Sequence, residues 1–221
     1  IGETILHAQG QETNREAIKQ WLIRALLKRH FGGQADGIYP VYRQLIQENS
    51  DTFPLDKIIE RYSGTNKSLD FYSEDVETLL SVKYGSAFAF MLLSLFYPLD
   101  HNYEFHQDHI HPKKYFTRKR LEKLGVATVD EREAFLERYN LLPNLQLLQA
   151  TPNVEKGATM LAKWLADNKS NPGVLEQYKE LHLFPPNASL EFTDFLEFYD
   201  GREKLIRSRL QQLLNVKQPT R

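Results

Sequence analysis

The chain has 221 residues, no cysteine and a formal net charge of −1, from 28 basic and 29 acidic residues. This length is enough for one large domain or two small ones, and a hydrophobic content of 41% allows a well-packed core. The absence of cysteine excludes disulfides and thiolate zinc sites, and fits a reducing, cytoplasmic setting. The near-zero charge excludes a generally basic surface, so any contact with nucleic acid must use a local patch.

The first residues and the most apolar run are the candidate signal and membrane segments. Residues 1–7 have no basic run and no long apolar core, so we expect no signal peptide. The most apolar run, from Ala87 to Tyr97, is closed by Pro98 and is too short to cross a bilayer. We therefore expect a buried helix there and no membrane partner. Because the chain starts without Met, we interpret it as part of a longer protein.

Helical spacing of apolar residues dominates the chain. Residues 1–11 are weakly patterned and suggest at most a short strand or a stub of a preceding domain. Asn14 is a good N-cap and Gly32-Gly33 a good stop, which predicts a first helix over 15–31. Further helices are expected at 39–47, 54–62, from 73 to a break at Gly85, and at 87–96, 117–124, 131–139, 153–165, 172–178 and 190–214. Two strands are expected, at 104–110 and 145–148.

Two stretches, 105–113 and 144–157, concentrate side chains with catalytic chemistry. Hydrolysis of a phosphodiester needs an activated water, a cation to neutralise the phosphate and help for the leaving oxygen. Asp108, His109 and Asn153 supply a carboxylate, an imidazole and an amide oxygen, a set that suits a hard divalent cation. On an extended strand Asp108 and His109 point to opposite faces, on two sides of one phosphate. Lys156, one turn after Asn153, adds a phosphate contact.

The pattern Asp108-His109-Ile110-x-Pro112, then 144–148, then Asn153-x-x-Lys156-Gly157, resembles the HNH (ββα-metal) nuclease motif. More closely, residues 105–113 with Trp164-Leu165 resemble the C-terminal nuclease domain of GmrSD-type restriction proteins. The resemblance extends over most of residues 20–215.

The resemblance implies four roles. Asp108 and Asn153 bind a divalent metal, Mg²⁺ with Mn²⁺ or another divalent ion as the alternative, and His109 is the general base. Asn144 holds the loop and orients His109 through a backbone hydrogen bond. It also implies a ParB-like, nucleotide-hydrolysing N-terminal domain as a missing partner, and a role in phage defence. Many HNH proteins carry zinc-binding cysteines where this chain has Gln149 and Pro152, so no structural zinc is expected.

Other candidates come from the same region. Lys113, His106 and His111 are expected to contact substrate, although a buried or structural role for each histidine stays open. Four histidines lie between residues 101 and 111, but one strand cannot aim all of them at a single zinc ion. The basic run from Lys113 to Lys123 is either a solvated helix face or a phosphate-tracking patch.

We predict an α+β, predominantly helical protein with a small ββα-metal unit embedded between helical segments. Its expected parts are a helical segment at 1–99, the nuclease unit at 100–167 and a helical segment at 168–221 that packs on it. The predicted function is metal-dependent endonucleolytic cleavage of DNA, as the nuclease part of a phage-defence restriction protein. The alternatives are an RNase with the same site and an inactive nucleic-acid- or protein-binding module.

Overall fold

The computed structural model describes residues 2–33, 36–49 and 51–218, and the side chains of the first helix from residue 10 onward. The chain is predominantly helical, with a small two-stranded antiparallel sheet, as the sequence predicts. Two compact units are present: one comprises residues as far as Ser73 together with those from Gln212 onward, and the other comprises Glu74–Gln211. The three segments expected from the sequence, with bounds after residues 99 and 167, stay a prediction.

The first unit is a small helical cluster built from α1 (Gly2–Leu27), α2 (Ile38–Gln47) and α3 (Leu55–Tyr62). Its core joins these residues: Ala25, Ile38, Tyr42, Ile58, Tyr62 and Leu69. The expected strand or stub over residues 1–11 is wrong from residue 2 onward, because α1 already begins at Gly2; residue 1 lies outside the described residues. Asn14 does not cap this helix. Its side chain instead accepts a hydrogen bond of 2.8 Å from the Phe53 N–H.

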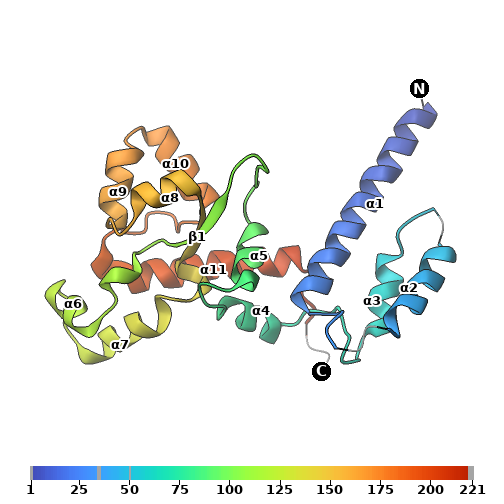
Figure 1. Cartoon of the computed structure of the whole chain (residues 1–221), viewed down its shortest axis with the longest axis horizontal. Coiled ribbons are helices and arrows are strands. Elements are labelled where there is room, and N and C mark those ends of the chain that lie inside the picture. Colours follow the sequence, from blue (N-terminus) through green and yellow to red (C-terminus); the bar gives the residue numbers. More distant parts are fainter. Residues whose placement is uncertain (1, 34–35, 50, 219–221) are drawn as a thin grey trace. The chain divides into compact units, whose positions relative to one another are not determined.

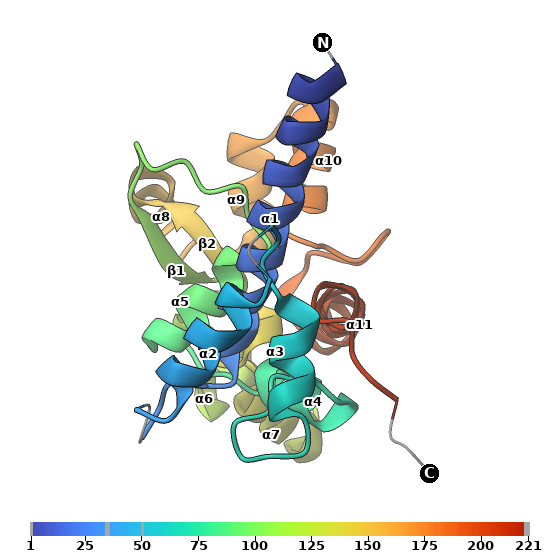
Figure 2. The same cartoon turned by 90° about the vertical axis from the view of Figure 1, so that its right-hand side faces the viewer.

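The second unit holds the hairpin and most of the helices (Figure 1). Its α-helices are α4 (Ser73–Leu80, whose first residue belongs to the other unit), α5 (Ala87–Ser94), α6 (Arg118–Lys123), α7 (Val129–Arg138), α8 (Ala150–Lys156), α9 (Leu161–Asn168), α10 (Pro172–Leu181) and α11 (Phe195–Leu213). Three short 3-10 helices are η1 (Lys113–Tyr115), η2 (Leu142–Asn144) and η3 (Phe192–Asp194). The strands are β1 (Phe105–His109) and β2 (Leu145–Gln149), which lie side by side in Figure 2.

The register of the hairpin decides which side chains face which helices. Phe105 pairs with Gln149 at one end and His109 with Leu145 at the other. Since side chains alternate along a strand, Asp108 shares a face with its partner Gln146, and His109 points to the opposite face. On the face of Asp108, Leu148 packs with residues of α9 and α10, and Lys156 of α8 pairs with Asp108. Helix α5 also contacts both strands, and the two predicted catalytic side chains leave β1 on opposite faces.

The single helix expected over 153–165 is wrong. Two helices occupy this region, because the chain turns at Gly157, where φ is +46° and a side chain would be strained. The first of them, α8, begins at Ala150, so Asn153 lies inside the helix and does not open it.

The last helix begins at Phe195, later than the expected Leu190, and continues through Gly201 without a break. Gly201 has a packing reason: a Cβ atom there would lie 2.7 Å from Cγ of Pro185. The glycine thus permits close contact between α11 and the turn after α10, both of which belong to the second unit. In the described part of the chain, no helix is both long enough and apolar enough to cross a membrane.

Candidate functional site

A cavity of about 350 Å³ opens where β1 ends. Its walls include Tyr84, Asp108, His109, Lys113 and Gly157. Three of the residues predicted from the sequence, Asp108, His109 and Lys113, therefore line one space. They come from the end of the strand and from the 3-10 turn that follows it, whereas Tyr84 comes from the segment between α4 and α5.

The imidazole of His109 is held between two tyrosine rings and a hydrogen bond. The Tyr84 ring lies 4.4 Å away, centroid to centroid, at 35°, and the Tyr139 ring lies 6.2 Å away at 23°. Nε2 of His109 lies 3.0 Å from Oδ1 of Asn140. An amide oxygen only accepts hydrogen bonds, so in this arrangement Nε2 carries the proton and Nδ1 keeps its basic lone pair.

The groups that hold His109 are themselves fixed. The backbone N–H of Tyr84 donates to the carbonyl of Asn140 at 3.0 Å, and Lys83 and Leu141 form an antiparallel bridge beside it. Gly85 donates to the side chain of Gln107, on the same strand as His109, at 2.9 Å. The segments that carry Tyr84 and Asn140 are therefore hydrogen-bonded to each other, and this fixes the groups that orient the imidazole.

The surroundings of His109 favour the neutral ring. Its side chain is buried, with the residue only 6% exposed, and burial lowers its pKa below the usual value of 6.5. The hydrogen bond to Asn140 and the charge of Asp108 oppose this shift, whereas the charges of Lys113 and Lys156 add to it. A neutral imidazole at neutral pH is the form that can accept a proton.

Asp108 is engaged by a buried lysine. Its Oδ2 forms an ion pair with Nζ of Lys156 and accepts a hydrogen bond from Nε2 of Gln146, both at 2.8 Å. Gln146 in turn accepts a bond of 2.8 Å from the hydroxyl of Tyr178, which fixes the orientation of the amide. Nζ of Lys156 also donates to the carbonyl of His109 at 2.7 Å. Lys156 is fully buried, so it supports Asp108 and the strand and does not reach the substrate phosphate expected of it.

Asn144 acts on the backbone that follows His109. Its Oδ1 accepts from the N–H of His111 at 2.9 Å, and its Nδ2 donates to the carbonyls of His111 and Tyr139 at 3.1 and 2.7 Å. Its own carbonyl accepts from the N–H of Ile110 at 2.8 Å. The buried guanidinium of Arg202 donates to carbonyls of η2 and so fixes the turn that carries Asn144. Asn144 thus holds the loop, and the contact with the imidazole of His109 comes from Asn140.

The two other predicted histidines lie outside the cavity. His111 is fully buried, with its ring centroid 5.0 Å from that of Phe198 and 5.5 Å from that of Phe195. Neither of its ring nitrogens has a partner among the described residues, and burial lowers its pKa to about 3. His106 is partly exposed and lies 3.1 Å from the carboxylate of Glu104. The structure therefore does not bring either of them to Asp108 and His109.

Asn153 is half-buried on α8, three residues before Lys156, so both lie on the helix side that faces β1. Its side chain makes no hydrogen bond within the described residues, and it does not line the cavity. Across the described part of the chain, no three aspartate, glutamate or histidine side chains gather as metal ligands would. A metal at this site would therefore take most of its ligands from amide oxygen, water and substrate.

The sequence did not point to Asn140 or Tyr84. Asn140 follows the end of a predicted helix and is 31 positions from His109, and Tyr84 lies at the end of another predicted helix, directly before its expected break at Gly85. No spacing rule links either residue to the motif, because both reach His109 only through tertiary contacts.

Comparison of the chain with protein-family models and with curated proteins finds no match. The fold and site define a predominantly helical protein with one hairpin, in which a buried neutral histidine and an ion-paired aspartate share a cavity lined by lysine. Its function is inferred below from this geometry and from the motif.

Proposed function

We propose that this protein is a metal-dependent endonuclease of the HNH type that cleaves DNA. The observation that carries the proposal is the setting of His109: the ring is buried, its Nε2 is held by Asn140 so that Nδ1 is left as the basic nitrogen, and the residue lines one cavity together with Asp108. The order of β1, a long loop, β2 and α8 also fits the ββα arrangement that the sequence motif implies.

In the proposed reaction, Nδ1 of His109 takes a proton from a water molecule as its oxygen attacks phosphorus. The bond between phosphorus and the 3′ oxygen breaks, and the 3′ oxygen leaves with the electron pair. A divalent ion supplies Lewis-acid stabilisation of the phosphate and of the leaving oxygen when it is bound. Asn140, Tyr84 and Tyr139 keep the imidazole in place during the proton transfer.

The oxygen donors near His109 fit a hard cation. The ion pair with Lys156 and the hydrogen bond from Gln146 both fall on Oδ2 of Asp108, so among the described residues Oδ1 stays uncommitted. Asn153, with its uncommitted amide oxygen, lies on the helix side that faces β1. Because Mg²⁺ keeps several waters and needs only one or two protein oxygens, these two residues would hold it together with substrate phosphate. Mn²⁺ has similar ligand preferences and is a second choice.

The chain as a whole has no net positive charge, but positively charged side chains line the cavity. Lys113 and Lys114 both line it, in the 3-10 turn directly after the motif. Exposed lysines of α6 continue this basic segment, which is suited to tracking a phosphate backbone. These contacts favour an anionic polymer as the partner, and by the family resemblance we propose phage or modified DNA. The same resemblance suggests a ParB-like domain N-terminal to this chain in the full-length protein.

The test is conversion of supercoiled plasmid to nicked and linear forms in Mg²⁺ or Mn²⁺, with EDTA as the metal control. We expect His109→Ala to abolish cleavage and His101→Ala, an exposed histidine outside the cavity, to leave it unchanged. Cleavage that survives His109→Ala would overturn the mechanism. Cleavage of RNA in preference to DNA would make the protein an RNase, and binding without cleavage in either metal would favour the binding module.

A further inference from the structure

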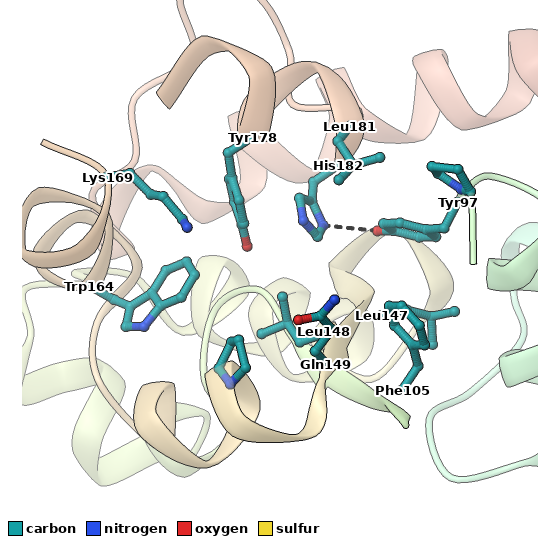
Figure 3. A pocket seen from close by; sticks show the side chains of 12 residues that line it. Tyr97, Phe105, Leu147, Leu148, Gln149, Trp164, Lys169, Tyr178, Leu181 and His182 are labelled. Atoms are coloured by element: carbon teal, nitrogen blue, oxygen red, sulfur yellow. Dashed lines mark hydrogen bonds between the residues drawn. The ribbon is translucent and has the colours of Figure 1, made fainter. Parts of the chain in front are cut away.

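A second cavity, of about 220 Å³, lies at the opposite end of the hairpin, where Phe105 pairs with Gln149. Its walls combine aromatic and aliphatic side chains and are contributed by β1, β2, α9, α10 and the segments beside them (Figure 3). Figure 3 shows Trp164 and Lys169 at one end and Tyr97 at the other, with Tyr178 and His182 facing Gln149 across the space. Of these lining residues, Tyr178 alone enters the site described above, through its hydroxyl contact with Gln146.

The aromatic walls are preformed. The hydroxyl of Tyr97 lies 3.0 Å from Nδ1 of His182, and the rings of Tyr178 and His182 stack with centroids 4.0 Å apart. The Trp164 ring lies 5.4 Å from that of Tyr178. The hydroxyl of Tyr178 is bonded to Gln146, in the network that supports Asp108. A planar ligand would therefore meet rings that are already fixed, and would lose little binding free energy to ordering them.

Three polar groups at this cavity are uncommitted. Lys169 is half-buried, with Nζ 5.8 Å from the ring centroid of Tyr178, and it pairs with no carboxylate among the described residues. The side-chain amide of Gln149 makes no hydrogen bond within the described part of the chain. Trp164 is only 4% exposed, and its buried Nε1 also lacks a hydrogen-bond partner within the described residues. This nitrogen has no accessible surface, so the lysine and the amide are the polar groups that a ligand in the cavity can reach.

We propose that this cavity, lined by Tyr97, Phe105, Gln149, Trp164, Lys169 and Tyr178, binds a nucleotide. The base stacks among the aromatic rings, its polar edge meets the free amide of Gln149, and its phosphate pairs with Lys169. A purely apolar ligand would leave the lysine and the amide unpaired, and a simple anion would leave the aromatic surface uncovered. A base with an attached phosphate satisfies all of these groups.

The nucleotide can be free or part of a strand. Phe105 and His109 lie on the same face of β1, four residues apart, which places them about 13 Å from each other along the strand. That separation is within reach of a few nucleotides of an extended single strand. A strand bound at the first cavity could thus place a flanking base in the second one, and the experiment separates this case from a free nucleotide.

The chain has two tryptophans, Trp21 in the first unit and Trp164 in this cavity, so Trp21→Phe leaves Trp164 as the single fluorescent reporter. The titrants are the four deoxynucleoside monophosphates and short single-stranded homopolymers, in EDTA so that no cleavage intervenes. We expect saturable quenching of Trp164. Lys169→Glu should weaken binding by about tenfold or more, because it replaces a charge-assisted contact with repulsion.

Lys163→Glu is the matched control. Lys163 lies on α9, makes an exposed ion pair with Asp167 and does not line the cavity, so the same change in charge should alter binding by less than about twofold. Circular dichroism checks that each variant is folded, and anisotropy of labelled oligonucleotides repeats the comparison with Trp21 intact.

Quenching by monophosphates as well as by oligonucleotides assigns the cavity to a free nucleotide, and quenching by oligonucleotides alone assigns it to a strand. Absence of quenching by either titrant overturns the proposal, and so does equal weakening by Lys169→Glu and Lys163→Glu. Because the assay needs neither metal nor cleavage, its result is independent of the nuclease activity proposed above.

Discussion

Replacement of Asn140 tests how the protein sets the proton position on His109. The two atoms of this contact, Nε2 and Oδ1, are 3.0 Å apart, and the hydrogen bond raises the pKa of an imidazole that burial otherwise lowers. Asn140→Asp places a carboxylate at the same atom, which should raise the pKa of His109 by about 1–3 units. Asn140→Leu removes the acceptor, so the pKa should fall below that of the wild type, and the orphaned N–H should cost about 1–3 kcal/mol of folding free energy.

The direct assay is an NMR titration of the His109 ring in metal-free protein, which reports the pKa whether or not the protein cleaves DNA. The second assay is the pH profile of kcat/KM for plasmid cleavage. The unprotonated ring is the active base, so the acidic limb of the profile should move to higher pH in Asn140→Asp and to lower pH in Asn140→Leu. Loss of ring orientation should also reduce the plateau rate of Asn140→Leu by about 10–100-fold.

Asn102→Asp is the control for charge alone, since Asn102 is exposed and bonded to Asp100 outside the cavity. It should leave the pKa of His109 within error of the wild-type value. An identical His109 pKa in the wild type, Asn140→Asp and Asn140→Leu would refute the contact. An equal shift of the His109 pKa in Asn102→Asp would show that the shift is a general effect of net charge.

Three further outcomes follow from the same geometry. Lys156→Met should lower the unfolding free energy in urea by about 3–5 kcal/mol, because it leaves the mostly buried carboxylate of Asp108 without its cation; a loss below about 1 kcal/mol would contradict that role. The pKa of His111 is about 3 in the folded state against 6.5 ordinarily, so the unfolded chain binds the extra proton and stability falls as pH drops below 6.5. His111→Phe should remove about 1.4 kcal/mol per pH unit from that slope between pH 6 and 4, and an unchanged slope would place His111 elsewhere. Lys113→Ala should reduce the slope of log Kd against log salt for DNA by about 1, while Lys204→Ala, an exposed lysine of α11 outside the cavity and the basic segment, should not; equal effects would make the change a general effect of net charge.

Local patterns were enough to predict the hairpin. The strand expected at 104–110 appears as β1 at Phe105–His109, and the one expected at 145–148 appears as β2 at Leu145–Gln149. A proline marks one boundary of each strand in the sequence: Pro112 follows the first strand, and Pro143 precedes the second. Where a turn residue sits next to an apolar run, sequence alone locates the element well.

The errors arose where a local signal was weak or was outweighed. Residues 2–11 show no apolar periodicity, so nothing in them predicts that α1 starts at Gly2. Gly157 is an ordinary helix-stop signal, but reading Asn153 as a helix cap required the helix to continue past it. A positive φ at Gly157 ends α8, and the cap interpretation fails with it.

For the site, the sequence predicted some positions and missed others, while the roles of the residues stay predictions. Asp108, His109 and Lys113 line one cavity. His111 does not, because its side chain points into the core cluster of Phe195 and Phe198, a contact that links residues more than eighty positions apart. Sequence periodicity carries no information about such distant packing.

The ion pair of Lys156 shows why the predicted residues do not act independently. One ammonium group bonds the side chain of Asp108 and the carbonyl of His109, so it fixes the carboxylate and the strand position of the imidazole together. The same charge also lowers the pKa of His109 and of His111, and burial of all these groups strengthens the effect. Removing Lys156 should therefore change the position of Asp108 and the basicity of His109 in one step. Double-mutant cycles between Lys156 and His109 should be non-additive for this reason, whereas cycles between His109 and the exposed Lys119 should be additive.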